Sequence, residues 1–218
     1  KKNKLTPSDR VKLAASAQRV RESGVIVEAG SMAAEEVISK IRYLHATKGV
    51  TEFWFDRIEL INVSALNKDT DSGRGEFMAR IRTLVVDLEI RIFIACQLRK
   101  TYESRARCEP EMVDLKGTSA LGDSATHVVL LSRAEYHGIT EMEDGSSSAG
   151  LGKIMLVKNT EGGLGDFVCR FNATCTTWEP FDKDDHSKWN GDGVDKTEPV
   201  YGAVPKTIKV DDSQDIPF

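Results

Sequence analysis

The chain has 218 residues, of which 40% are hydrophobic and 29% are charged, and its formal net charge is −4; it can bury a full core, and its composition is ordinary for a globular protein. No apolar run approaches the roughly 20 residues of a membrane-spanning helix, and no signal peptide is visible, so we expect a cytoplasmic protein. The chain begins with Lys1-Lys2 and no methionine, which suggests a fragment or a processed product.

The amino-terminal part predicts two helices with a short strand between them. Thr6-Pro7-Ser8-Asp9 has a capping threonine, a proline at the first helical position and an acid three residues on, so we expect a helix from here to about Arg21. Val25 to Glu28 predicts a short strand. Ala33 to Lys48 carries apolar residues on one face, as an amphipathic helix does, and Gly49 marks its end.

The middle of the chain predicts a parallel α/β sheet. Phe53-Trp54-Phe55-Asp56 is an apolar strand that ends in a carboxylate, and Arg91 to Cys96 is a second strand, which ends at Gln97. Between them, Asn62 to Gly75 has the composition of a loop, and Glu76 to Glu89 that of an amphipathic helix. Continuous apolar strands that alternate with helices are typical of a parallel sheet. A carboxylate at the carboxyl edge of such a sheet can bind a magnesium ion.

The stretch from Asp114 to Arg133, D-L-K-G-T-S-A-L-G-D-S-A-T-H-V-V-L-L-S-R, joins a loop to a strand. The loop is expected to be flexible, and it carries one cation, Lys116, among small residues. Small side chains let a nucleic-acid backbone come close to a cation, so the loop is a candidate DNA contact. His127 to Leu131 is a short apolar run rich in β-branched residues, which predicts a buried strand. Arg133 lies just beyond this strand.

The carboxyl-terminal part predicts a hairpin and a tail. Glu135 to Gly150 is acidic and rich in Ser and Gly, as surface loops are. Ile154 to Val157 and Phe167 to Phe171 predict the hairpin, and Cys175 to Trp178 a further edge strand. Residues 181–218 hold nine acids and five lysines, hence the whole net charge, and lack an apolar pattern. We therefore expect a main domain over 1–180 and a disordered acidic tail over 181–218.

Four pieces of the sequence resemble, in the same order, the RecA-like motor domain of hexameric replicative DNA helicases, the DnaB type and the phage primase–helicases. They are F-W-F-D-R-I-E-L-I, I-F-I-A-C-Q-L-R-K, the stretch from Asp114 to Arg133, and K-N-T-E-G-G-L-G. The resemblance runs from Leu5 to about Glu179. It implies an α/β, RecA-like fold with a mostly parallel sheet flanked by helices and a carboxyl-terminal β-hairpin. It also implies an ATP- and Mg²⁺-dependent helicase that forms a homo-oligomeric ring, expected to be a hexamer, and translocates on single-stranded DNA.

The resemblance also assigns roles to residues. Asp56 would orient the Mg²⁺–ATP complex, directly or through water, and Gln97 would sense the γ-phosphate. The single strand would be contacted by the loop residues Lys116, Gly117, Thr118 and Ser119.

Two cations match those that this family extends to the nucleotide of a neighbouring subunit. They are Arg133 and Lys158, and a cation supplied in this way stabilises charge on the transferred phosphoryl group. The family has an arginine two residues after the lysine, where this chain has Thr160. Either Arg133 and Lys158 suffice for ATP hydrolysis without that arginine, which we favour, or the subunit is a weak ATPase.

No phosphate loop of the form G-x-x-x-x-G-K-[ST] occurs in the sequence. Gly150-Leu151-Gly152-Lys153 comes near it, but Ile154 follows the lysine and the segment precedes a strand. In the family, the phosphate loop and a catalytic glutamate lie before the position of Leu5. We therefore expect an incomplete motor domain, inactive as a fragment, and Glu59 is not favoured as a substitute base.

The chain ends in Asp215-Ile216-Pro217-Phe218, which resembles the acidic tip of bacterial single-stranded-DNA-binding proteins. Phage primase–helicases also end in an acidic tail with a terminal phenylalanine, which binds their polymerase. The resemblance implies docking on a replication protein or a polymerase. The alternative function is a non-catalytic RecA-fold module that binds DNA and recruits partners through this tail. A filament-forming recombinase is a third option, but the helicase-like D-L-K-G-T-S-A-L argues against it.

Overall fold

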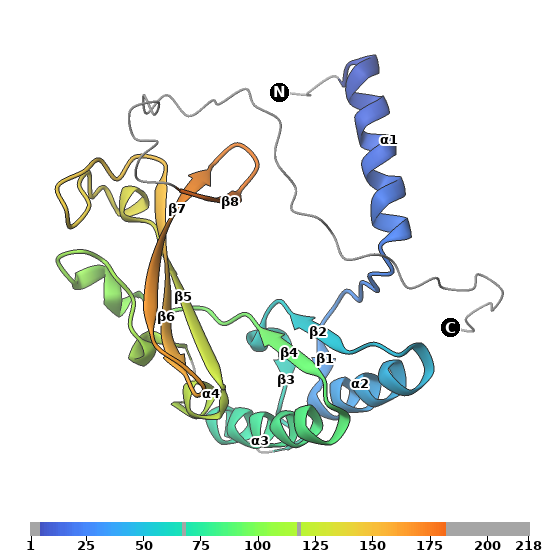
Figure 1. The fold of residues 1–218 in the computed structure, drawn as a ribbon. Helices are drawn as coiled ribbons and strands as arrows, with labels where there is room; N and C mark the ends of the chain where they lie inside the picture. The colour runs from blue at the N-terminus through green and yellow to red at the C-terminus, as the bar shows by residue number, and fades with distance from the viewer. Residues whose placement is uncertain (1–4, 67–68, 117–118, 182–218) are drawn as a thin grey trace. The chain divides into compact units, whose positions relative to one another are not determined.

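The computed structural model describes residues 5–66, 69–116 and 119–181 (Figure 1). The chain divides into two units, one of residues 1–30 and 196–218, the other of residues 31–195. The predicted tail beyond residue 181, including Asp215 to Phe218, and the loop residues Gly117 and Thr118 lie outside the described residues. No helix in the described part of the chain is long and apolar enough to cross a membrane.

Helix α1 (Pro7–Glu22) begins as the sequence predicts. The Thr6 hydroxyl accepts a hydrogen bond from the Asp9 backbone N–H, and the Asp9 carboxylate accepts one from the Thr6 N–H. No residue of α1 is buried. The strand predicted at Val25 to Glu28 is absent, so this prediction is wrong. Apolar residues alone do not make a strand, because its backbone also needs a partner edge, and no described segment pairs with this one as a strand.

The first part of the second unit alternates strands and helices, as predicted. Its elements are β1 (Met32–Ala33), α2 (Ala34–Lys48), β2 (Glu52–Phe55), the 3₁₀ turn η1 (Ile58–Leu60), β3 (Ile61–Asn62), α3 (Thr70–Leu88) and β4 (Arg91–Ile94). The strands form two separate parallel pairs, β1 with β3 and β2 with β4. The chain leaves α2 through Gly49, which has the left-handed conformation (φ 66°) that favours glycine.

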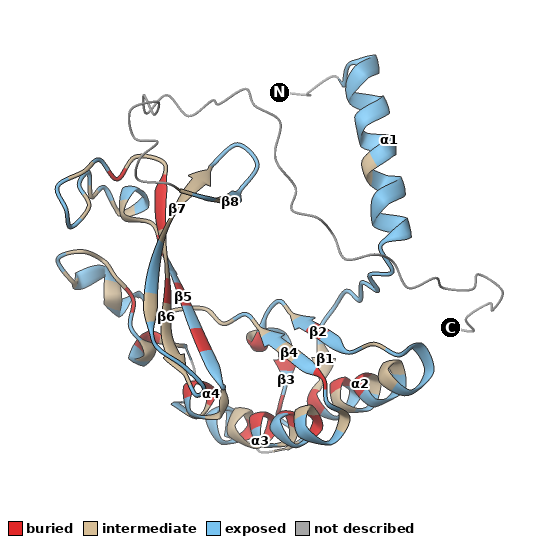
Figure 2. Ribbon diagram, in the orientation of Figure 1, coloured by how far each residue is buried: buried red, intermediate tan, exposed pale blue. Residues whose placement is uncertain are grey.

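The main hydrophobic core lies between these strands and the two helices. Figure 2 shows the buried residues as red segments of α2, α3 and the neighbouring strands. In both helices the buried residues recur at helical spacing, which confirms the predicted apolar faces. Fully or nearly fully buried apolar side chains at the centre include Val37, Ile41, Ile58, Phe77, Ile81 and Leu84.

Helix α3 begins six residues before its predicted start at Glu76, inside the segment predicted as a loop. The Asp69 carboxylate caps it by accepting the Ser72 N–H at 3.0 Å. A Cβ on Gly73 would lie 2.9 Å from Val63 Cγ2, so glycine lets the helix lie close to the chain beside it. Glycines that suggest a loop by composition serve here for close packing inside a helix.

The second part of this unit is an antiparallel sheet. Its strands β5 (His127–Ser132), β6 (Leu151–Asn159), β7 (Gly165–Asn172) and β8 (Thr177–Pro180) pair in sequence order. The predicted hairpin is confirmed, and the edge strand lies slightly later than predicted. The expectation of a mostly parallel sheet is wrong in proportion, because the largest sheet is antiparallel. Strand β5 was expected to be buried, but only alternate residues are: Val128 and Leu130 are buried, whereas Val129 and Leu131 are each 52% exposed.

Short helical turns join the two parts. They are η2 (Lys100–Ser104), η3 (Met112–Asp114) and α4 (Ser119–Ser124), and η4 (Ala134–His137) follows β5. The predicted surface loop from Glu135 to Gly150 therefore includes part of η4. Ser119, predicted in a flexible loop, is the first residue of α4. A short helix forms here because the sequence from Ser119 contains no helix-breaking proline and its Leu121 side chain is buried in the core.

Candidate functional site

The parallel pair brings two predicted site residues to one edge of the sheet. Phe55 of β2 is opposite Ile94 of β4, so Asp56 and Gln97 both follow the carboxyl ends of adjacent strands. Backbone bonds continue the pairing past the strands: the Ala95 N–H donates to the Phe55 carbonyl at 2.9 Å. The Asp56 side chain is exposed and makes no hydrogen bond or ion pair within the described residues. A carboxylate in this state is available to a ligand.

Glu59 links these two strand ends, a role that the sequence did not reveal. Its Oε1 accepts the backbone N–H of Gln97 at 3.1 Å. Its Oε2 is buried, has no hydrogen-bond partner among the described residues, and lies 3.9 Å from Arg57 Nε. The available signal was an acid three residues after Asp56, within the turn η1 that follows the strand end.

Lys116, the predicted DNA cation, lies against Gln97, the predicted phosphate sensor. The Lys116 N–H donates to the Gln97 carbonyl at 2.8 Å, and the Lys116 Nζ lies 3.5 Å from Gln97 Oε1. Leu98 and Leu115 form an antiparallel bridge beside this contact. Residues 114–116, the first residues of the loop predicted to be flexible, are therefore bonded to residues 97–99, which follow β4.

A thiol adds to this attachment. The Cys96 Sγ donates to the Lys116 carbonyl at 3.4 Å. Burial raises the pKa of the Cys96 thiol, and the negative charge of Glu59 acts in the same direction. The thiol therefore stays protonated at neutral pH and can serve as a donor.

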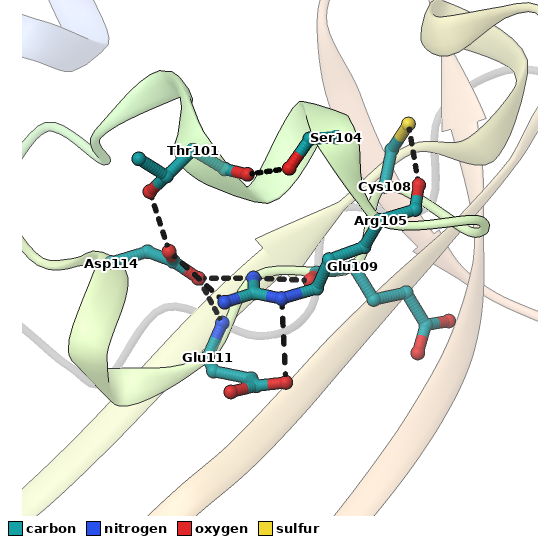
Figure 3. Close-up of polar contacts among 7 residues, drawn as sticks. All are labelled: Thr101, Ser104, Arg105, Cys108, Glu109, Glu111 and Asp114. Carbon is teal, nitrogen blue, oxygen red and sulfur yellow. Dashed lines mark hydrogen bonds and ion pairs between the residues drawn. The ribbon is translucent and has the colours of Figure 1, made fainter.

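Asp114, the first residue of the helicase-like stretch, is buried and fully engaged (Figure 3). Its carboxylate accepts from the Thr101 hydroxyl at 2.9 Å, from the Glu111 N–H at 2.8 Å, and from both terminal nitrogens of Arg105. The Arg105 guanidinium lowers the pKa of Asp114, and this effect outweighs the opposing effect of burial. Asp114 is therefore ionised at neutral pH.

The two predicted cations for a neighbouring nucleotide start from opposite ends of the antiparallel sheet. Lys158 on β6 is opposite Val128, near the start of β5, whereas Arg133 follows Ser132 at the end of β5. At roughly 3.3 Å per residue, their backbones are about 17 Å apart along the strands. The structure does not bring these two residues together.

Both cations have partners in their own chain. The Lys158 ammonium donates to the Gly122 and Asp123 carbonyls, each at 2.9 Å, in the last turn of α4. A cation is favoured there by the exposed carbonyls of a helix end. The Arg133 guanidinium carbon lies 3.6 Å from the centroid of the Phe171 ring, a contact that the sequence did not suggest. Thr160 is exposed, and its N–H donates to the Thr126 carbonyl.

The protein groups at the strand ends supply only part of the ligands that a Mg²⁺ ion needs. The described residues contain no cluster of three or more His, Cys, Asp or Glu side chains suited to a metal. Mg²⁺ is commonly held by one or two carboxylates together with water and nucleotide phosphates. The single unengaged carboxylate of Asp56 is compatible with that mode of binding.

A cavity of about 160 Å³ lies elsewhere, beside β6, and none of the predicted site residues lines it. Its wall includes Lys153, whose ammonium contacts Glu109 at 3.3 Å and Asp166 at 3.2 Å. Burial opposes the charge of Lys153, but these carboxylates outweigh it and raise the pKa of the amine. Gly152 and Lys153 lie inside β6, with the Trp178 ring against Gly152. This confirms that Gly150 to Lys153 is not a phosphate loop.

Comparisons with known proteins agree with the helicase-like motifs. The family model for the DnaB-like helicase C terminal domain matches residues 1–180. A probable plasmid replicative DNA helicase of Chlamydia psittaci is 26% identical over 140 residues, which are 64% of this chain and 29% of that protein. The replicative DNA helicase DnaB of Geobacillus stearothermophilus is 23% identical over 186 residues, 83% of this chain and 40% of its own length. The chain thus spans about a third of the length of these curated relatives.

Solved structures share the fold. One solved ATPase domain is similar with a TM-score of 0.68 and 17% identity, over 82% of this chain and 62% of that one. A DnaB-like replicative helicase, solved in a study of its interactions with primase, gives a TM-score of 0.69 and 17% identity, over 83% of this chain and 44% of that one. The family match over residues 1–180 by itself establishes that the chain belongs to the DnaB-like helicase C terminal domain family.

Proposed function

We propose that these residues form most of the motor domain of an ATP-dependent replicative DNA helicase. The complete protein forms a homo-oligomeric ring, a hexamer, that translocates on single-stranded DNA and unwinds duplex. The observation that carries this proposal is the direct contact between Gln97 and Lys116, at 2.8 Å through the backbone and 3.5 Å through the side chains. A residue suited to a nucleotide phosphate thus touches a residue suited to a DNA phosphate.

The strand ends supply the nucleotide contacts. Asp56 would hold Mg²⁺ through its unengaged carboxylate, and Gln97 would donate from its amide to a terminal phosphate. When bound, ATP would supply the phosphoryl group, and Mg²⁺ would neutralise negative charge on its phosphates. Glu59 keeps the Gln97 backbone in place through the 3.1 Å hydrogen bond.

The side-chain amide of Gln97 can contact Lys116 and a nucleotide phosphate at the same time, because it has both an acceptor oxygen and a donor nitrogen. Its Oε1 lies within 3.5 Å of the Lys116 ammonium. No described residue accepts from its Nε2, which leaves this end for a phosphate oxygen. Movement of the amide on gain or loss of a phosphate would therefore change the position of the Lys116 ammonium. Gly117, Thr118 and Ser119, the next residues in the sequence, are proposed as further DNA contacts.

Arg133 and Lys158 are proposed as contacts to nucleotides in the ring. Lys158 would exchange the Gly122 and Asp123 carbonyls for a phosphate of the neighbouring subunit. Arg133, about 17 Å away, would reach the nucleotide from the other end of β5, restrained by Phe171. Thr160 contributes a hydroxyl and no charge, so Lys158 acts there without the arginine of the family pattern.

The carboxyl terminus is proposed as a docking tip for a replication protein or a polymerase in a bacterial or phage-infected cell. Its residues, Asp215 to Phe218, combine acids with a terminal aromatic ring. An aromatic ring can fill a pocket while the acids meet basic residues around the rim.

Replacement of Asp56 by alanine tests the enzymatic part of the proposal. In the full-length protein that carries these residues, we expect ATP turnover to fall by about a hundredfold or more, on the order expected for the loss of a metal-orienting carboxylate. The fold should persist because the side chain is exposed and has no partner among the described residues, so circular dichroism should be unchanged. Asp87→Ala, an exposed acid on α3, is the matched control and should leave turnover intact.

A non-catalytic DNA-binding and recruitment module is the second candidate. Thr160 favours it, because threonine cannot supply the charge of the family arginine, as does the lack of a G-x-x-x-x-G-K-[ST] loop among the 218 residues. This candidate predicts that the full-length protein binds single-stranded DNA but turns over no ATP, with or without Asp56.

A further inference from the structure

The segment proposed to contact DNA begins at a buried ion pair. The Asp114 side chain is 2% exposed, and its partner Arg105 is 32% exposed. The guanidinium spans both carboxylate oxygens, the geometry in which an arginine–carboxylate pair is strongest and most directional. Two further donors, the Thr101 hydroxyl and the Glu111 N–H, complete the shell around the carboxylate.

This ion pair lies next to the proposed DNA cation in the chain and is bonded to the same strand end. The Asp114 carbonyl accepts the Arg99 N–H at 2.7 Å, and two residues later the Lys116 N–H donates to Gln97. The three residues 114–116 thus lie antiparallel to residues 97–99. With the side chain of Asp114 held by Arg105, the backbone at Lys116 has little freedom to shift along residues 97–99.

The ion pair is also tied to the antiparallel sheet. Arg105 Nη1 donates to the Glu109 carbonyl at 3.1 Å, and the Glu109 carboxylate contacts the Lys153 ammonium on β6 at 3.3 Å. The segment from residue 99 to 114 is therefore closed at its ends by the Arg99–Asp114 hydrogen bond and tied to β6 through Glu109. These bonds restrain the loop that leads to Lys116.

We infer that Arg105 and Asp114 are positioning residues that fix Lys116 where it can meet both Gln97 and a single-strand phosphate. The inference rests on the proposed function, since it assigns a purpose to the pair only if Lys116 contacts DNA. Neither Arg105 nor Asp114 is required to touch DNA. A pair that merely stabilises the fold would affect DNA binding independently of Lys116.

A double-mutant cycle on single-strand affinity separates these two roles. The full-length protein is titrated with an oligothymidylate at several salt concentrations, as wild type, Lys116→Ala, Asp114→Asn and the double variant. Lys116→Ala should weaken binding by up to about fivefold, as for one exposed ionic contact, and lower the salt slope by about 0.7. Asp114→Asn should reproduce both changes, and the double variant should bind no worse than Lys116→Ala.

Arg105→Lys provides a second variant in case Asp114→Asn does not fold. It keeps a positive charge but cannot span both carboxylate oxygens, so it should show the same loss of salt slope in a folded protein. Losses that add in the double variant, or wild-type slopes in both Asp114→Asn and Arg105→Lys, would overturn the positioning role. No effect of Lys116→Ala would instead overturn the proposed DNA contact.

Discussion

In the second unit, the parallel pair β2–β4 and the antiparallel sheet β5–β8 position their predicted site residues differently. At the parallel pair β2 and β4, Asp56 and Gln97 follow the strands at the same edge, and the Lys116 N–H donates to the Gln97 carbonyl there. In the antiparallel sheet, Arg133 and Lys158 lie at opposite ends of the β5–β6 ladder. Strand direction accounts for the difference, because parallel strands end at one edge and antiparallel strands do not.

The two regions also differ in whether a predicted site residue already has a partner within the described part of the chain. Asp56 has no partner among the described residues, whereas Lys158 donates to two carbonyls of its own chain. Lys158 must give up this helix-end interaction to serve a neighbour, at a cost of about 0.3–1 kcal/mol. The exposed Asp56 carboxylate is therefore open to a ligand in this structure, whereas the role proposed for Lys158 requires its ammonium to leave these two carbonyls.

The largest effect on folding stability is expected at Glu59, which accepts the backbone N–H of Gln97. Glu59→Ala leaves the Gln97 N–H without its acceptor in a half-buried site, which should cost about 1–3 kcal/mol of unfolding free energy in the full-length protein and reduce DNA-stimulated ATP turnover. Glu59→Gln keeps a carbonyl oxygen and should restore both. If glutamine behaves as badly as alanine, the hydrogen bond to Gln97 is not the reason for the effect.

Subunit mixing tests the antiparallel region. Lys158→Met keeps the aliphatic length and removes the charge, so a ring of this variant should turn over ATP slowly. A ring of Asp56→Ala subunits is inactive at its own sites but still offers Lys158 to its neighbours. Mixed rings should therefore exceed both parent variants in turnover. Lys48→Met, in the last turn of α2, is the control for loss of a helix-end cation; absence of any gain on mixing would rule out a contribution in trans.

The smallest effect is a pH dependence of stability at Asp114. The folded protein lowers the pKa of this carboxyl below its unfolded value of about 3.9, chiefly through Arg105. The stabilisation is therefore present above about pH 4 and is lost as pH falls through the folded-state pKa. Urea unfolding should show Asp114→Asn less stable than wild type at pH 7, with the gap narrowing at pH 3. A constant gap would show that the charge on Asp114 does not matter.

The sequence predicted the parallel region better than the antiparallel one, for physical reasons. Asp56 and Gln97 could be placed because side chains that follow parallel strands meet at one edge, whatever the loops between them. The end of α2 followed from Gly49, whose left-handed conformation stops a helix locally. Local rules failed at α3, where Gly73 indicated a loop but provides close packing on Val63.

The sequence did not reveal which distant segments of the chain pair with one another. The contact of Lys116 with Gln97 depends on residues 114–116 lying against residues 97–99, and no local pattern specifies that register. Likewise, Arg133 and Lys158 matched family motifs, but their separation became visible only from the pairing of β5 with β6. The sequence motifs therefore identified the candidate residues, and the structure showed which residues each of them contacts.

The central claim is that nucleotide and DNA are coupled through the contact of Gln97 with Lys116. Its most direct test is the single-strand affinity of the full-length protein, with and without a non-hydrolysable ATP analogue, in wild type, Gln97→Ala and Lys116→Ala. The account predicts that the analogue changes the affinity of wild type and that this change disappears in both variants. An undiminished response to the analogue in Gln97→Ala would contradict it.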